Sequence, residues 1–181
     1  MQDVDISLGP EMKSTGEVMG IDYHYSRALY KAIVGAGMSI PKNGCILFTV
    51  ADKDKDEMKE LAKAFSDLNF KIVATEGTAK ALESVGIEAE VVGKVHQRSV
   101  DIIERIKSGK IHMVVNTHTP GQHVMRDGFK IRRATVEHAI PCLTSLDTAW
   151  EVLRMLSFMR DRRLVYSLAI QDYVGGGDEL A

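Results

Sequence analysis

The sequence has few of the features that mark a specialised class of protein. Among its 181 residues there are two cysteines and four prolines, and no apolar run reaches the roughly 20 residues that a membrane-spanning helix needs. The formal charge of -2 gives no general attraction to nucleic acid or to an anionic membrane surface. The N-terminus, MQDVDISLGP, has no basic stretch followed by an apolar run, as a secretory signal would. These absences predict a cytoplasmic globular protein whose partners are neither nucleic acids nor membranes.

The cysteines and histidines also lack the spacing of a metal site. Cys45 and Cys142 lie in the apolar segments GCILFTV and IPCLT, without a CxxC pair, and the six histidines show no metal-binding spacing with carboxylates. We therefore expect two buried thiols in a reducing compartment, with no disulfide, no metal and no cofactor in this chain.

Two common nucleotide-binding motifs are missing as well. There is no GxxxxGK[ST] loop, which excludes a P-loop nucleotide hydrolase, and no GxGxxG follows a candidate strand.

Alternating strand and helix patterns are present from residue 44 onward. A continuous apolar run at 45–51 is typical of a strand buried on both faces. Further strands are expected at 70–74, 89–93, 111–116 and 139–144. Helices are expected from Asp54 or Asp56 to Leu68 and at 79–85, 99–109, 131–139 and 146–161. This alternation predicts a three-layer, Rossmann-like α/β domain with a mainly parallel five-stranded sheet.

The two ends of the chain have a different pattern. Residues 1–43 contain one expected helix at 25–37, which is too short to form a core of its own, so we treat 1–43 as a trailing segment and 44–181 as the domain. An extended piece is expected over 163–174, followed by a loose tail, GGGDELA.

Several polar residues follow the expected strands, at the edge where parallel sheets bind ligands. They are Lys55, Thr75, Gly77, Thr78, Lys94, Asn116, Thr117 and Thr119. Hydroxyls, lysines and helix N-termini together suit a phosphate. Taken singly, Thr75 or Thr78 could instead cap a helix, Lys55 could be a surface residue, and Asn116-Thr117 could belong to a turn. Glu76 is the one carboxylate clearly within the group, which predicts a binding site rather than a catalytic one.

Several stretches of the chain resemble a known protein family. The stretches FTVADKDK, ATEGTAKAL, VGKVHQ, IKSGKIHMVVNT, IRRATVEHAIP and SLAIQDYV are similar to a methylglyoxal-synthase-like domain. The earlier stretch GPEMKSTGEVMGID resembles the end of the second ATP-grasp unit in the large subunit of carbamoyl-phosphate synthetase. Together they identify the chain as similar to the C-terminal section of that large subunit.

The resemblance implies an allosteric domain that binds a phosphorylated effector, commonly UMP or IMP. It places phosphate and ribose contacts on Lys55, Thr75, Thr78, Lys94 and Asn116, with Thr117 or Thr119 supplying a further hydroxyl. ATP and magnesium would bind in the rest of the large subunit, and a glutaminase subunit would be an indirect partner. The chain alone is then expected to catalyse nothing, and a homo-oligomer is possible.

Departures from the family pattern bear on the other functions that the fold supports. Gln97 and Arg98 stand where methylglyoxal synthase has its aspartate base, which counts against that activity. A lysine at position 94, where N-acetylglutamate-binding relatives have a tryptophan, favours a phosphorylated ligand. Cys142-Leu143-Thr144 replaces the Tyr-Asp-Thr run of the ornithine site. The alternatives are a stand-alone enzyme of this fold, either a methylglyoxal synthase or a relative of the inosinate cyclohydrolase domain, and a purely structural module that mediates subunit contacts.

Overall fold

The computed structural model describes residues 18–93, 98–117, 122–160 and 168–175. By their contacts these residues form two compact units. The larger unit contains Ile40–Trp150 and carries the β-sheet, and the smaller one groups the described residues 18–39 with the described residues from Glu151 onward. The sequence predicts a sheet domain over residues 44–181, which also includes the residues after Trp150. That domain assignment stays a prediction.

The larger unit is built on one five-stranded sheet. Its strands are β1 (Gly44–Thr49), β2 (Phe70–Thr75), β3 (Glu90–Val92), β4 (Met113–Asn116) and β5 (Cys142–Leu143). They lie in the order β3-β2-β1-β4-β5, and all four pairings are parallel. The predicted α/β fold with a five-stranded parallel sheet is therefore confirmed. The chain adds strands first on one side of β1 and then on the other, so the strand order reverses between β1 and β4.

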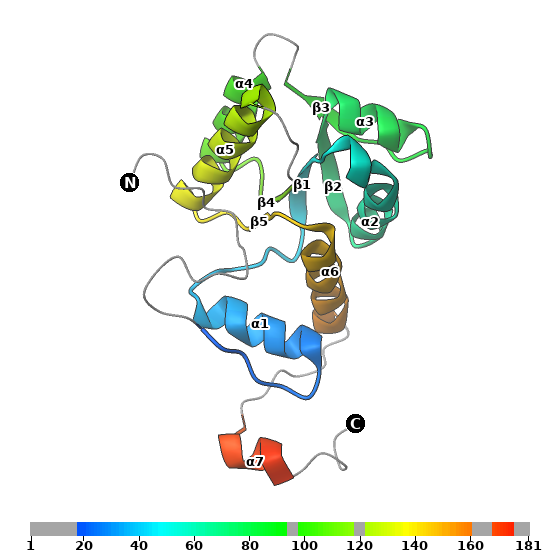
Figure 1. The fold of residues 1–181 in the computed structure, drawn as a ribbon. Coiled ribbons are helices and arrows are strands. Elements are labelled where there is room, and N and C mark those ends of the chain that lie inside the picture. The colour runs from blue at the N-terminus through cyan, green and yellow to red at the C-terminus, as the bar shows by residue number, and fades with distance from the viewer. Residues whose placement is uncertain (1–17, 94–97, 118–121, 161–167, 176–181) are drawn as a thin grey trace. The chain divides into compact units, whose positions relative to one another are not determined.

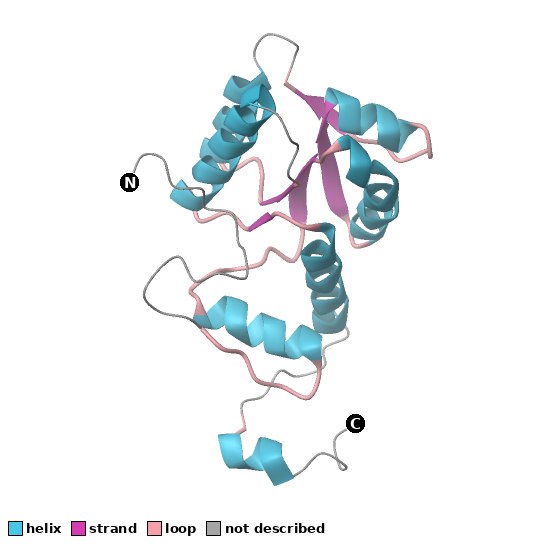
Figure 2. Ribbon diagram, viewed as in Figure 1, coloured by secondary structure: helices cyan, strands magenta, loops and turns pink. Residues whose placement is uncertain are grey.

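Helices cover both faces of the sheet (Figures 1 and 2). They are α2 (Lys55–Asp67), preceded by a 3-10 turn at Asp52–Asp54, α3 (Glu76–Glu83), α4 (Arg98–Lys107) and α5 (Gln122–Glu137). The pair α2 and α3 lies on one face, and the pair α4 and α5 lies on the other (Figure 1). A further helix, α6 (Leu146–Arg160), begins in this unit and ends in the smaller one.

The core lies on both sides of β1, as its unbroken apolar run predicts. Leu47 belongs to a buried cluster with Ile102 of α4 and Ile131 of α5. The next residue, Phe48, points to the other face, where its ring lies 6.2 Å from that of Phe65 on α2 in an edge-to-face arrangement. Alternate side chains of one strand therefore hold the two helical layers to the sheet.

Most of the expected elements are present, but two differ. The helix expected at 131–139 is the second half of a longer one, since α5 begins at Gln122. The interior Gly128 argues against helix there, because glycine weakens helices. The extended segment expected over 163–174 is wrong in its last part, where residues 170–175 form the short helix α7 (Ile170–Gly175). The start of that segment and the expected tail at 176–181 lie outside the described residues.

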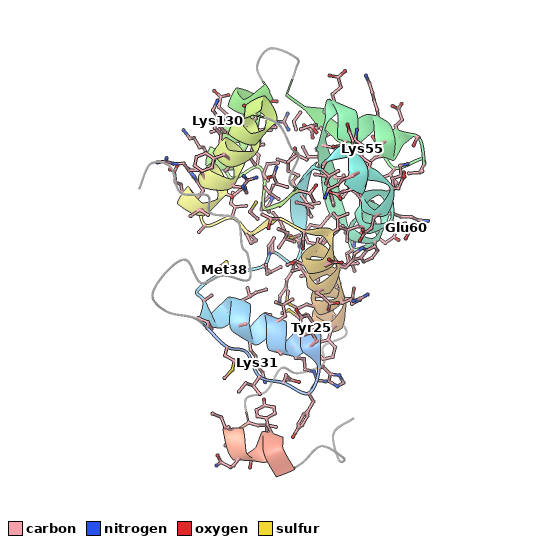
Figure 3. The ribbon with its side chains drawn as sticks, in the orientation of Figure 1. Tyr25, Lys31, Met38, Lys55, Glu60 and Lys130 are labelled. Atoms are coloured by element: carbon pink, nitrogen blue, oxygen red, sulfur yellow. The ribbon has the colours of Figure 1, made fainter. Side chains whose placement is uncertain are left out.

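The smaller unit contains α1 (Tyr25–Gly35), the helix expected at 25–37, together with the end of α6 and α7. Lys31 of α1, labelled in Figure 3, holds its segments together. Its ammonium group donates to Asp22 Oδ2 at 2.8 Å and to the Tyr173 hydroxyl of α7 at 2.7 Å. The Tyr23 hydroxyl donates to the carbonyl of Asp172 at 2.9 Å. Residues far apart in the sequence are thus joined by a charged and partly buried hydrogen-bond network.

No helix within the described ranges is long and apolar enough to cross a bilayer.

Candidate functional site

Lys55 brings a positive charge from the end of β1 to the start of α3. It is the first residue of α2, is labelled in Figure 3, and its Nζ lies 3.5 Å from the point where a Cβ atom on Gly77 would be. Its Nζ also contacts Asp52 Oδ1 at 2.6 Å, and the Asp52 side chain is 94% exposed while that of Lys55 is 26% exposed. The ammonium group therefore has a solvated carboxylate on one side and the first turn of α3 on the other.

Thr75 and Thr78 form a hydroxyl pair at the same helix start. Thr75 occupies the N-cap position of α3, but its side chain makes no capping hydrogen bond. Its hydroxyl donates instead to Thr78 Oγ1, at 3.2 Å, and Thr78 is buried. The expectation that these threonines cap the helix is therefore wrong for Thr75. The first N–H groups of α3 have no capping bond from Thr75, and two hydroxyls lie beside them.

Asn116 and Thr117 lie at the end of β4, and both side chains are buried. Thr117 Oγ1 accepts a hydrogen bond of 2.8 Å from the backbone N–H of Ala51, which follows β1. This bond crosses the point where the strand order reverses. Asn116 Oδ1 accepts a hydrogen bond of 2.8 Å from Arg132 Nη1 of α5. The interpretation of Asn116-Thr117 as simple turn residues does not account for these two long-range contacts.

The strand register places these groups on three adjacent strands. Asn116 of β4 pairs with Thr49 of β1, and Thr75 of β2 follows Ala74, which pairs with Phe48. The end of β1 therefore lies between Thr75 and Asn116. Since neighbouring strands are about 4.8 Å apart, the two ends that flank β1 are roughly 10 Å apart.

Asp101 of α4 accepts a hydrogen bond from the residue that follows β3. Its Oδ2 accepts a hydrogen bond of 3.0 Å from the N–H of Gly93, whose φ of +76° favours glycine. Lys94, the next residue, and Thr119 lie outside the described residues, so their predicted roles stay predictions. The other six predicted site residues all lie at the carboxyl edge of the sheet.

An ion-pair network supports Asp101 from the amino edge of the sheet. Arg105 donates to Asp101 Oδ1 at 3.3 Å and to Glu90 Oε1 at 2.5 Å, and Lys71 Nζ lies 2.5 Å from Glu90 Oε2. The hydrogen bond from Lys71, followed by that from Arg105, lowers the pKa of Glu90 to about 2. Glu90 is therefore ionised at neutral pH, and the network joins β2, β3 and α4.

Two open hollows lie at that amino edge, away from the predicted site. One, of about 820 Å³, is bounded by Phe70, Val85 and Glu90, and the other, of about 710 Å³, by Cys45, Arg105 and His112. Four of the residues that line the second hollow belong to the ion-pair network, namely Lys71, Glu90, Asp101 and Arg105. Ligands of open parallel sheets bind at the opposite edge, where helix N-termini point.

The cysteine and metal predictions concern residues outside the site. Cys45 and Cys142 are free thiols, in line with the prediction, although both are half-buried rather than fully buried. Burial raises the pKa of the Cys142 thiol to about 11, which makes it a poor nucleophile at neutral pH. In the described part of the chain no group of three His, Cys, Asp or Glu side chains is placed to hold a metal ion.

Sequence reasoning did not nominate Arg132 as a site residue. It occurs in the stretch IRRATVEHA, where two consecutive arginines on an amphipathic helix are typical of a solvated face. Its 4% exposure and its contact with Asn116 become apparent only from the packing of α5 against β4.

Comparisons with known proteins agree with this architecture. The family model of the MGS-like domain matches residues 57–144, which run from α2 to the residue after β5. This matched segment is similar to an MGS-like domain. A solved structure of methylglyoxal synthase from Elizabethkingia anophelis NUHP1 is similar to it at a TM-score of 0.50 and 18% identity, covering 63% of this chain and 79% of that one. A structure of ForH matches at a TM-score of 0.48 and 20% identity, covering 74% and 88%. The methylglyoxal synthase structure supports the fold of the MGS-like domain alone.

Proposed function

We propose that this chain is the allosteric section of a carbamoyl-phosphate synthetase large subunit, and that its MGS-like domain binds the phosphate of a regulatory nucleotide such as UMP or IMP. The observation that carries the proposal is the approach of Lys55 Nζ to Gly77 beside the Thr75–Thr78 hydroxyl pair. A cation, two hydroxyls and a helix N-terminus then converge on one place.

The phosphate would bind at the first turn of α3. The helix N-terminus supplies N–H donors and positive potential, the hydroxyls of Thr75 and Thr78 rotate to donate to phosphate oxygens, and Lys55 supplies charge. Gly77 has no side chain to block the approach of an oxygen to the backbone.

A second set of contacts favours a nucleotide over free phosphate. Asn116 lies two strands away from Thr75, roughly 10 Å across the sheet. A nucleoside monophosphate extends over such a distance from its phosphate through its sugar to its base, whereas inorganic phosphate would reach one end of the site. Lys94 and either Thr117 or Thr119 complete the proposed contacts, although the Thr117 hydroxyl already accepts the Ala51 N–H.

The charges near the first turn of α3 support binding rather than catalysis. Asp52 is paired with Lys55, and Glu76 with Lys80 at 3.1 Å, so both carboxylates are engaged with lysines. Gln97 and Arg98 replace the aspartate base of methylglyoxal synthase. Bound effector would instead control ATP-dependent carbamoyl phosphate synthesis, for pyrimidine and arginine biosynthesis, at sites in the remainder of the large subunit, which in turn receives ammonia from the glutaminase.

Calorimetric titration of the purified chain with UMP, IMP, UTP and N-acetylglutamate tests the proposal. We expect heat from a nucleoside monophosphate, and about ten-fold or greater loss of affinity in Thr78→Ala, because a hydrogen bond to a charged group is worth about 1.5–3 kcal/mol. Ser84→Ala, at the exposed C-terminal end of the same helix, is the matched control and should bind as the wild type.

A parallel assay with dihydroxyacetone phosphate distinguishes the enzymatic alternative. Release of methylglyoxal would contradict the proposal. Absence of heat with all four compounds would favour a structural module.

A further inference from the structure

A buried arginine, Arg132, donates a hydrogen bond to the buried side chain of Asn116. Arg132 is not among the residues proposed to contact the nucleotide. Arg132 is 4% exposed and Asn116 is 3% exposed, and Arg132 Nη1 donates to Asn116 Oδ1 at 2.8 Å. Asn116 ends β4, next to the end of β1, while Arg132 comes from the middle of α5. The contact therefore joins a helix of one layer to the carboxyl edge of the sheet.

The chemistry of the two groups fixes which way the amide of Asn116 faces. A guanidinium group can only donate hydrogen bonds, so the amide atom that faces it must be the oxygen. The two N–H groups of the amide cannot bond to Arg132 and are left for another acceptor; the amide nitrogen lies 3.9 Å from the position of a Cβ atom on Gly128. Without Arg132, rotation of the amide by 180° would exchange donor and acceptor.

Gly128 makes room for this pair. A Cβ atom on Gly128 would lie 3.2 Å from Arg132 Nη1 and 3.6 Å from Asn116 Oδ1. Glycine in a helix interior costs about 1 kcal/mol relative to alanine. Its place one turn before Arg132 leaves the space that the guanidinium group and the amide occupy.

We infer that Arg132 is a positioning residue, which holds the Asn116 amide so that its N–H donors face the bound ligand. This inference rests on the proposed function and extends it. The β4 end of the site would accept ligands that present an acceptor oxygen there, such as an oxygen of the nucleoside, and would disfavour ligands that present only a donor. The buried positive charge of Arg132 behind the amide further favours an anionic ligand.

Three variants separate positioning from a purely structural role. Asn116→Asp keeps an acceptor for Arg132, and gains a charge-assisted bond to it, but removes the N–H donors. Arg132→Met removes the donor and the charge at similar length. Arg132→Lys keeps the charge and one possible donor to Asn116 Oδ1.

The measurement is calorimetric titration of the whole chain with UMP and with inorganic phosphate, with thermal unfolding recorded for each variant. We expect Asn116→Asp to unfold at or above the wild-type temperature and to bind UMP about ten-fold or more weakly. Arg132→Met should lose a similar factor, and Arg132→Lys should recover part of it.

The outcomes are distinguishable. If the wild type binds and Asn116→Asp binds equally well, the inference is overturned and the proposed function stands. The inference is overturned in the same way if Arg132→Met is folded and binds as the wild type. If the wild type binds neither probe, the proposed function and the inference that rests on it both fail.

Discussion

Thr117 Oγ1 accepts the backbone N–H of Ala51 at 2.8 Å, and this bond joins the ends of β1 and β4 where the strand order of the sheet reverses. Ala51 and Thr117 are both buried. Crevices at such reversals are where open parallel sheets bind ligands. The bond therefore fixes the spacing of the two strand ends between which a ligand would lie.

Replacing the Thr117 hydroxyl should destabilise the fold. Thr117→Val has nearly the same shape but leaves the buried Ala51 N–H without its acceptor, which costs about 1–3 kcal/mol. Urea unfolding of Thr117→Val and of Thr117→Ser, which keeps the hydroxyl, measures this. Equal stability of the two variants would show that the hydrogen bond contributes little.

Much of this edge of the sheet could be predicted from the sequence. The apolar run at 45–51 indicates a strand buried on both faces. The order of residues along the chain then places Lys55, Gly77 and Asn116 at or just after the ends of predicted strands. Parallel pairing then brings them to one edge. That Lys55 Nζ reaches Gly77 is consistent with this expectation.

The remaining features depend on tertiary contacts. The Thr75 hydroxyl bonds to Thr78 and makes no cap, a choice between two local partners that the sequence leaves open. Gly128 is tolerated inside α5 because of the Arg132–Asn116 pair, and the burial of Arg132 follows only from the packing of α5.

Removing the charge of Asp52 should strengthen phosphate binding. The Asp52 carboxylate pairs with Lys55 at 2.6 Å, so an anionic ligand has to compete with it. Exposed ion pairs are worth about 0–1 kcal/mol, so Asp52→Asn should raise the affinity for UMP by up to about five-fold. Asp56→Asn is the matched control, since Asp56 is also exposed and pairs with Lys59 instead. Weaker binding in Asp52→Asn would mean that the carboxylate itself helps to hold the ligand.

A methyl group on Gly77 should affect binding without harming the fold. A Cβ atom there would lie 3.5 Å from Lys55 Nζ, an ordinary contact, and alanine is the better helix former by about 1 kcal/mol. Gly77→Ala should therefore unfold at or above the wild-type temperature but bind UMP about ten-fold more weakly, because the methyl group lies where a phosphate oxygen would approach the backbone. Thermal unfolding tests the expected stability, and calorimetry on the same sample tests the expected loss of affinity. Unchanged affinity would place the phosphate elsewhere.

Acid should weaken the network around Glu90. Lys71 and Arg105 lower its pKa from 4.5 to about 2 in the folded state, so its contribution to stability is present above pH 4.5 and is lost as the pH falls toward 2. The side chain is 35% exposed, so solvent screening makes this contribution smaller than the pKa shift alone implies.

Urea unfolding of the wild type and of Glu90→Gln at pH 7 and pH 3 measures this effect. We expect Glu90→Gln to be the less stable protein at pH 7 and the difference to shrink at pH 3. Glu88→Gln, an exposed position two residues earlier, is the control and should show a smaller difference at pH 7. A stability difference for Glu90→Gln that does not change with pH would contradict this account.

The central claim is that a nucleotide phosphate binds at the carboxyl edge of the sheet, at the first turn of α3. Amide chemical-shift mapping by NMR during titration with UMP tests it most directly. We predict that the largest saturable shifts occur at Gly77 and Thr78, with further shifts at Asn116 and Thr117. Shifts confined to the amino edge, around Cys45 and Glu90, or no shifts at all, would contradict it.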